Sequence, residues 1–287
     1  MKFEDIRKIA VVGAGTMGAG IAQLAAQAGY NVLLYDLEAG ALEKAKAKTT
    51  KNLDGAIKRG KISAEDKPAI LDRMAYTSKF EDIKADVIIE AIVEKTQVKR
   101  DLFEKLIAQN APDAIMATNT SSIPITRIAV GQQNPERFVG MHFFNPAHIM
   151  KLVEIISGAA TAKETAALVY QLAEKMGKKP VNAKDAPGFI VNRVARHFYV
   201  EALQVAEEQV SDFETIDRLL EGQGFKMGPF TLMDLIGVDT NFSVTSSLFE
   251  SFHYDEKFRP NRIQEQKVQA GHHGRKSGRG FYSYENE

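Results

Sequence analysis

The sequence predicts an α/β protein in which a doubly wound parallel sheet is followed by a smaller all-helical domain. Over about the first 185 residues, short β-branched runs alternate with longer alanine-rich stretches of helical periodicity, a pattern that is typical of βαβ units. After Pro187-Gly188 no strong strand run recurs before the tail. A chain of 287 residues also exceeds the length at which single cores stop growing, so two domains are expected.

The elements of the first part follow one another in a regular order. Short apolar runs that favour buried strands occur at residues 9–12, 32–35, 87–89, 115–117, 138–141 and 152–156. Helical patterns are expected at residues 17–28, 97–108 and 161–176. Residues 38–75 are rich in Ala and Lys, and we expect them to form a helical excursion from the alternating pattern.

The second part changes character after the Pro-Gly pair. Residues 189–208 show helical periodicity, and Ser211-x-x-Glu214 resembles a capping box at the start of the next helix. We place the boundary near Asp185. The expected domains are therefore residues 1–185, with the excursion at about 38–75, and a helical C-terminal domain of residues 186–287.

Composition excludes several classes of function. Basic and acidic residues balance at 37 each, so no nucleic acid or membrane surface is expected as a partner. The chain contains no cysteine, which excludes disulfides and thiolate sites, and no metal site is expected. That composition fits a cytoplasmic protein. Residues 9–35 carry no charge, but five glycines and three amide side chains interrupt them, so membrane insertion is not expected.

A glycine-rich turn explains the uncharged run better. The motif G-x-G-x-x-G is formed by Gly13-Ala14-Gly15-Thr16-Met17-Gly18. Its position between a strand and a helix predicts a Rossmann-type dinucleotide site. Gly13 permits the tight turn, Gly15 lets the backbone approach a pyrophosphate, and Gly18 allows close packing of helix on strand. The positive end of the following helix would face the phosphates.

The second strand ends at Asp36, which lies 18 residues after Gly18. An acidic residue there accepts hydrogen bonds from both hydroxyls of the adenosine ribose and repels a 2′-phosphate. We therefore expect NAD as the cofactor, in preference to NADP. The alternative is a plain glycine-rich turn next to a surface aspartate.

Four further motifs follow in order along the chain. They are Asn119-Thr120-Ser121-Ser122, His142-Phe143-Phe144-Asn145-Pro146, Lys151-Leu152-Val153-Glu154 and Pro187-Gly188-Phe189-Ile190-Val191-Asn192-Arg193. With the glycine motif, this series resembles the L-3-hydroxyacyl-CoA dehydrogenase family, including the 3-hydroxybutyryl-CoA dehydrogenases. The resemblance covers nearly the whole chain. It implies reversible, NAD-dependent oxidation of an (S)-3-hydroxyacyl-CoA to a 3-oxoacyl-CoA, of short or medium chain length, in fatty acid or related acyl-CoA metabolism.

The residue types suit this chemistry. Removing a hydride from a secondary alcohol requires a base for the hydroxyl proton, and histidine is poised near neutral pH. His142 follows a strand at the carboxyl end of the sheet, where ligands of such folds bind. Glu154 would hold the other ring nitrogen and fix the tautomer. The resemblance assigns this pair the same roles, places Ser121 on the substrate oxygen, and places Asn192 near the reacting oxygen and the histidine.

The resemblance also implies contacts with the cofactor and with coenzyme A. The residues it places near NAD are Glu94, Lys99, Asn119 and Asn145. Lys51 and Lys58 fall in the excursion, where the family meets coenzyme A, and their charge suits its phosphates. Lys61 is an equal candidate, and all three lysines also fit a solvated helix face. The C-terminal domain resembles one that dimerises, so a homodimer is expected.

Three alternatives stay open. The first is a β-hydroxyacid dehydrogenase acting on a free acid. Members of that class resemble one another in using a catalytic lysine on the long helix between the domains. Residues 189–192 supply no such lysine. The second is a dehydrogenase of a sugar acid, which coenzyme A binding would distinguish. The third is a non-catalytic dinucleotide-binding or structural protein, which predicts loss of at least one catalytic candidate.

The acyl group is left open by the sequence. Lys226 and Phe230 depart from the residues expected beside the family's Gly-Pro pair, and residues 241–253 are also unfamiliar. A dicarboxylic substrate such as 3-hydroxyadipyl-CoA would require an extra cation in the pocket. The sequence places none.

Overall fold

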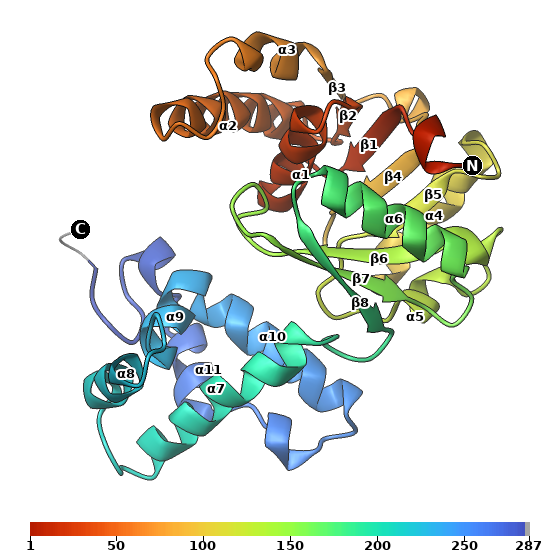
Figure 1. Cartoon of the computed structure of the whole chain (residues 1–287). Coiled ribbons are helices and arrows are strands. Elements are labelled where there is room, and N and C mark those ends of the chain that lie inside the picture. The colour runs from red at the N-terminus through yellow and green to blue at the C-terminus, as the bar shows by residue number, and fades with distance from the viewer. Residues whose placement is uncertain (285–287) are drawn as a thin grey trace. The chain divides into compact units, whose positions relative to one another are not determined.

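The computed structural model describes residues 1–284, which form two compact units, Met1–Ala186 and a second unit that begins at Pro187 (Figure 1). The first unit is built on one eight-stranded sheet of order β3-β2-β1-β4-β5-β6-β7-β8. The strands are β1 (Lys8–Val12), β2 (Asn31–Tyr35), β3 (Met74–Thr77), β4 (Val87–Glu90), β5 (Ile115–Thr118), β6 (Phe138–Phe143), β7 (Leu152–Ser157) and β8 (Lys179–Lys184). This confirms the predicted α/β class.

The sheet is parallel from β3 through to β6, and it reverses once. β7 pairs with β6 in the antiparallel sense, and β8 then runs parallel to β7. The strand order changes direction between β1 and β4, which is the switch point where dinucleotides bind in doubly wound sheets. The carboxyl ends of β1, β2 and β4 to β6 therefore share one edge.

Helices cover both faces of the sheet. They are α1 (Thr16–Gln27), α2 (Ala39–Lys58), α3 (Asp66–Asp72), α4 (Thr96–Gln109), α5 (Ile125–Ala129) and α6 (Lys163–Lys175). On one face α1 and α6 share a buried cluster with strand residues such as Val11 and Met141. On the other face Phe103 of α4 meets Phe138 of β6 edge-on, with ring centroids 5.1 Å apart.

Two strands were missed by the sequence prediction. β3 lies at the end of the region expected to be a helical excursion, of which α2 and α3 form the helical part. β8 has the residues Lys-Pro-Val-Asn-Ala-Lys and alternates between buried and exposed positions. Proline and lysine argue against a strand in the middle of a sheet, but both are accepted at an edge such as β8 occupies.

The second unit is helical. Its helices are α7 (Val191–Glu207), α8 (Phe213–Gly222), α9 (Pro229–Ile236), α10 (Val238–Ser251) and α11 (Arg262–Gln269). The rings of Phe213, Phe230 and Phe281 pack at centroid distances of 4.6 to 5.1 Å and join the tail to α8 and α9. The helix α8 begins one residue later than expected. Its cap is Asp212, whose Oδ1 accepts from the Thr215 amide at 2.7 Å, because a carboxylate caps a helix well.

Short 3-10 helices complete the architecture at Phe3–Asp5, Phe80–Asp82, Pro135–Arg137, Glu256–Phe258 and Arg275–Ser277. Within residues 1–284, none of the helices has the length and apolar character needed to cross a membrane.

Candidate active site

The glycine turn between β1 and α1 has the geometry of a phosphate site. Gly13 has φ +105°, and a Cβ there would lie 2.6 Å from the Ala91 carbonyl oxygen. A Cβ on Gly18 would lie only 1.7 Å from the Gly13 oxygen, whereas one on Gly15 would meet nothing within 4 Å. Gly15 is also the N-cap of α1 and offers no side chain to the amides of its first turn. Gly13 and Gly18 are thus required by packing, and the backbone at Gly15 is accessible to a ligand.

Asp36 is fixed directly beside this turn. Its Oδ2 accepts from the Ala14 amide at 2.7 Å, and its Oδ1 accepts from the Glu38 amide at 3.0 Å. A carboxylate has about four acceptor positions, so these two bonds orient Asp36 and leave capacity for a ribose diol. The turn and Asp36 together fit the adenosine end of NAD.

A buried lysine ties the next strand end to the loops. Lys99 is 1% exposed, and its Nζ lies 2.6 Å from Oε1 of Glu90 and 3.2 Å from Oε2 of Glu94. Thr118 adds a 2.6 Å hydrogen bond to Oε2 of Glu90. Lys99 is therefore buried between two carboxylates, and its charge is directed at Glu90 and Glu94.

Glu94 in turn organises the segment after β5. Its Oε1 accepts from the Thr120 hydroxyl at 2.5 Å and from the Ser121 amide and hydroxyl at 2.9 and 3.3 Å. Burial raises the pKa of the Glu94 carboxyl, but the charge of Lys99 and these hydrogen bonds outweigh it, so the pKa lies below its usual value. Glu94 is therefore ionised at neutral pH, and it holds Ser121 at the end of β5.

The end of β5 is also joined to the end of β6. Asn119 directly follows β5, and its Oδ1 accepts from the Phe143 amide at 2.9 Å. This bond connects two neighbouring strand ends, one carrying Ser121 and the other His142. The side chain of Asn119 therefore has a structural partner in addition to its expected place near NAD.

His142 and Glu154 form a buried pair. They face each other directly in the antiparallel register of β6 and β7, and His142 Nδ1 lies 2.8 Å from Glu154 Oε2. His142 is 5% exposed and Glu154 is 0% exposed. The ring of Phe144 packs against the imidazole, with ring centroids 4.6 Å apart. A carboxylate at this position selects the tautomer with hydrogen on Nδ1, which makes Nε2 the basic atom of the ring.

A cavity of about 260 Å³ opens beside the first turn of α1. It is lined by Thr16, Gly20, Lys48, Asn52, Asn145, Pro146 and His148. Lys48 reaches the Thr16 hydroxyl at 3.5 Å. The structure thus brings Lys48 of α2 to the glycine turn, while Lys51, Lys58 and Lys61 lie exposed and do not line this cavity.

Lys48 and His148 line this cavity although neither was among the site residues predicted from the sequence. Lys48 and Asn52 lie beside the buried stripe of α2, which is formed by Leu42, Ala45, Thr49 and Leu53. That periodic stripe was readable in the sequence and would have directed attention to Lys48. Burial and then the charges of Lys48, Lys178 and Arg59 lower the pKa of His148 below its usual value, which favours the neutral imidazole.

The turn that carries Asn145 is held by a lysine from another part of the chain. The bond between Asn145 and Pro146 is cis. Lys178, which is mostly buried, donates from Nζ to the carbonyl oxygens of Ala147 at 2.6 Å and Met150 at 2.8 Å. Burial lowers the pKa of Lys178 to about 8. This lysine holds the wall of the cavity in place.

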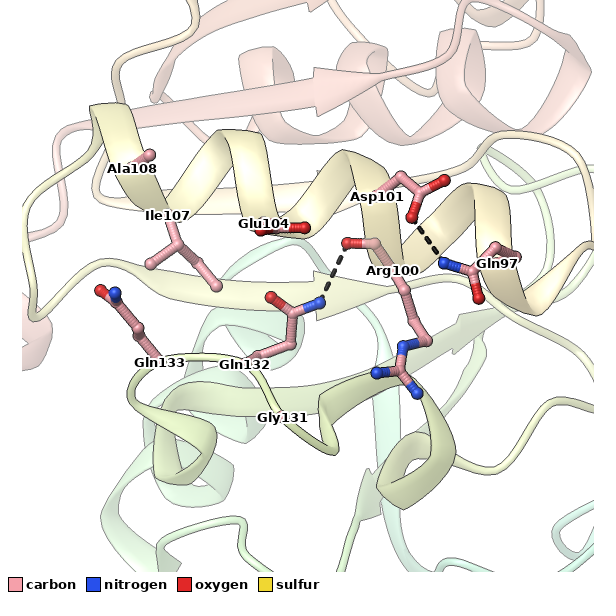
Figure 2. Close-up of a pocket in the computed structure, with 9 residues that line it drawn as sticks. All are labelled: Gln97, Arg100, Asp101, Glu104, Ile107, Ala108, Gly131, Gln132 and Gln133. Atoms are coloured by element: carbon pink, nitrogen blue, oxygen red, sulfur yellow. Dashed lines mark hydrogen bonds between the residues drawn. The ribbon is translucent and has the colours of Figure 1, made fainter.

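Another cavity is separate from these residues. A hollow of about 310 Å³ lies between α4 and the loop at residues 131–133 (Figure 2). Gln132 there donates to the Arg100 carbonyl at 2.9 Å. None of the predicted site residues lines it. In residues 1–284 no three His, Asp or Glu side chains gather as metal ligands would.

Asn192 lies in the first turn of α7, in the second unit. The turn before it is tight, with φ +71° at Gly188, where a Cβ would meet Leu248 Cδ2 at 2.6 Å. The Pro-Gly motif therefore sets where α7 begins. It thereby fixes Asn192 at the start of the helix.

Comparisons with known proteins agree over both units. The model of the 3-hydroxyacyl-CoA dehydrogenase NAD binding domain matches residues 8–186, and that of the family's C-terminal domain matches residues 188–284. The Escherichia coli (strain K12) protein named 3-hydroxyadipyl-CoA dehydrogenase is 46% identical over 285 residues, which are 99% of this chain and 60% of that protein. A probable 3-hydroxybutyryl-CoA dehydrogenase of Deinococcus radiodurans is 43% identical over 280 residues, covering 96% of this chain and 100% of the relative.

Solved structures give the same result. The crystal structure of (S)-3-hydroxybutyryl-CoA dehydrogenase from Ralstonia eutropha has a TM-score of 0.93 at 40% identity and covers 98% of this chain and 99% of that one. A 3-hydroxybutyryl-CoA dehydrogenase from Escherichia coli K12 has a TM-score of 0.95 at 46% identity, and this chain spans 60% of its length. The chain therefore belongs to the 3-hydroxyacyl-CoA dehydrogenase family of NAD-dependent oxidoreductases.

Proposed function

We propose that this protein interconverts an (S)-3-hydroxyacyl-CoA and a 3-oxoacyl-CoA with NAD, on a short or medium acyl chain. The observation that carries the proposal is the buried His142–Glu154 pair, with its 2.8 Å contact. A base held by a carboxylate is what removal of the hydroxyl proton requires. The pair lies at the end of β6, on the same sheet edge as the glycine turn.

Each residue has a distinct role in this proposal. NAD, when bound, supplies the acceptor for the hydride that leaves C3. His142 Nε2 takes the hydroxyl proton in oxidation and returns it in reduction, while Glu154 stabilises the imidazolium that forms. Ser121 and Asn192 would donate to the oxygen on C3, as preorganised neutral donors do.

The cofactor contacts are part of the same proposal. The residues assigned to NAD are Gly13, Ala14, Gly15, Thr16, Met17, Gly18, Asp36, Glu94, Lys99, Asn119 and Asn145. Support comes from the accessible backbone at Gly15 and from the orientation of Asp36. Lys99 would act by keeping Glu94 charged and in place. Asp36 would repel a 2′-phosphate, which favours NAD over NADP.

The proposal also includes contacts with coenzyme A and the formation of a homodimer. We assign Lys51 and Lys58 to coenzyme A as the resemblance implies, and we add Lys48 because it reaches the cavity beside α1. Residues 1–185 would bind NAD, and residues 186–287 would bind substrate and form a homodimer. A cytoplasmic location stays a prediction from the sequence. The names of the relatives include both 3-hydroxybutyryl-CoA and 3-hydroxyadipyl-CoA dehydrogenases. These names support a short acyl group in the substrate of this protein as well.

The test measures NADH absorbance during reduction of 3-oxoacyl-CoA thioesters of several lengths, beside the corresponding free acids and a sugar acid. The proposal expects turnover of the thioesters and little of the acids. Equal activity with a free acid would favour the β-hydroxyacid or sugar-acid alternatives. Absence of turnover with every substrate would favour a non-catalytic protein.

A further inference from the structure

One arginine is buried in the second unit. Arg196 of α7 is 3% exposed. Its Nη1 donates to the backbone oxygen of Asn241 at 3.0 Å, to the Oδ1 of the same residue at 3.1 Å and to the Thr245 hydroxyl at 2.8 Å. The Tyr199 ring lies against the guanidinium, 5.0 Å from Cζ to the ring centroid. Every one of these partners is uncharged.

The positive charge of Arg196 is therefore not balanced. Across residues 1–284, Arg196 has no ion pair with an Asp or Glu side chain. Burial lowers the pKa of Arg196 to about 10, which still leaves it charged at neutral pH. A buried cation without a counter-charge is costly. The three hydrogen bonds and the Tyr199 ring offset part of that cost, but the hydrogen bonds engage only one nitrogen of the guanidinium.

The hydrogen bonds of Arg196 use only one nitrogen. Its Nε is buried without a hydrogen-bond partner, and within the described part of the chain Nη2 makes no hydrogen bond either. The N–H groups of Nε and Nη2 point the same way along one edge of a guanidinium. That edge grips a carboxylate through two parallel hydrogen bonds. Asn241 and Thr245 thus hold the group through Nη1, and the Nε–Nη2 edge makes no hydrogen bond of its own.

Helix geometry relates Arg196 to the proposed reaction centre. Arg196 follows Asn192 by four residues on α7, so the two side chains share a helix face and are separated by about 6 Å along the axis. In the proposed function Asn192 contacts the oxygen on C3 of the substrate. One helical turn is similar in length to a few carbon–carbon bonds, which is the distance from C3 to the far end of a short acyl chain.

We propose that Arg196 is a specificity-determining residue that binds the terminal carboxylate of a dicarboxylic 3-hydroxyacyl-CoA. This inference rests on the proposed function and narrows its substrate class. The proposal assigns a cation to such a substrate, for which the sequence alone places none, because only burial distinguishes Arg196 from the many other basic residues. A neutral acyl chain of equal length would leave the Nε–Nη2 edge buried and unpaired, which penalises that substrate.

The test compares two substrates of equal chain length, 3-hydroxyadipyl-CoA and 3-hydroxyhexanoyl-CoA, which differ by a carboxylate in place of a methyl group. For the wild-type protein, kcat/KM should favour the dicarboxylic thioester by roughly 10- to 100-fold. Arg196→Met should abolish that preference and retain or raise activity on the hexanoyl thioester. Arg196→Lys keeps the charge without the paired donors, so it should recover part of the preference.

A matched control removes a positive charge elsewhere in the same unit. Arg218 of α8 is an exposed arginine whose nearest carboxylate, Glu214, is 3.9 Å away. Arg218→Met should change kcat/KM of both substrates by less than about twofold. Equal loss on both substrates in Arg196→Met, with the circular dichroism spectrum unchanged, would reduce Arg196 to a packing residue and overturn the inference.

A measurement on the wild-type protein tests the inference even if the Arg196 variants do not fold. Adipyl-CoA and hexanoyl-CoA lack the reacting hydroxyl, so each can be tested as a competitive inhibitor. Tighter inhibition by adipyl-CoA supports the inference, and equal or weaker inhibition overturns it. Activity without discrimination would refute the inference alone, whereas inactivity toward both hydroxyacyl thioesters would refute the proposed function and this inference with it.

Discussion

Replacing Glu154 by Gln tests the buried pair with the smallest change of shape. The amide keeps the volume of the carboxylate at a position that is 0% exposed, so packing of β7 should survive. The charge is lost, however, and the amide N–H can donate to Nδ1 of His142. That donation would place the ring hydrogen on Nε2, where it blocks the atom needed as the base.

The size of the effect follows from the geometry. The 2.8 Å contact is a charge-assisted hydrogen bond once the imidazole is protonated, and such a bond contributes about 1.5–3 kcal/mol. At about 1.4 kcal/mol per factor of ten, its loss alone lowers kcat roughly 10- to 100-fold. The wrong tautomer adds to this, so we expect kcat to fall by roughly 10²–10⁴ in total.

The assay is steady-state NADH absorbance with a 3-oxoacyl-CoA, together with NADH binding by fluorescence. NADH affinity should change by less than about threefold, because Glu154 lies on β7 and Asp36 lies on β2, at separate places in the sheet. The control is Glu174→Gln, which makes the same change on an exposed carboxylate of α6 and should leave kcat unaltered. If Glu154→Gln kept kcat within a few-fold of the wild type, the carboxylate would have no part in proton transfer.

Three further outcomes are expected. His142→Gln should lower kcat by roughly 10²–10⁴ with NAD affinity nearly intact; normal turnover would mean that another group is the base. Asp36→Arg should shift the ratio of kcat/KM values from NAD toward NADP, because it replaces the charge that repels a 2′-phosphate; a wild-type protein that already prefers NADPH would contradict this role. Lys178 has its pKa lowered by burial from 10.5 to about 8, so folding penalises its charged form, and its contribution to the free energy of unfolding should rise between pH 8 and 10.5. Urea titrations of the wild type and Lys178→Met across that range would show their difference growing in favour of the wild type, and a difference that shrinks or stays constant would contradict the assignment.

Local patterns in the sequence were sufficient to predict the glycine turn. Strand, glycine motif and helix are contiguous between residues 8 and 27, so spacing alone predicts their geometry. Asp36 was predictable for the same reason, since it follows the next strand. β8 was not, because its proline and lysines describe an edge position only after the order of the strands is known.

Interactions between distant residues were harder to predict. Glu90 is buried at the end of β4 and pairs with Lys99 nine positions later. In the sequence, a carboxylate after an apolar run usually indicates that a strand has ended, so this pattern does not predict a buried ion pair. Lys48 and Arg196 are two members of a set of 37 basic residues. What separates them from the others is a cavity wall in one case and burial in the other, and both are products of tertiary packing.

The reversal at β7 explains why the His142–Glu154 pair lies inside the sheet. In a purely parallel sheet the chain would leave β6 through a helix before the next strand, and the next strand would start again from the opposite edge. Here a short turn at residues 144–151 returns the chain antiparallel, so that residue 154 lies directly opposite residue 142. The phosphate site needs exposed backbone amides, which a loop supplies. A proton-transfer pair needs fixed distances, which two hydrogen-bonded strands supply. The single antiparallel step in the sheet therefore places the His142–Glu154 pair at the same sheet edge as the glycine turn.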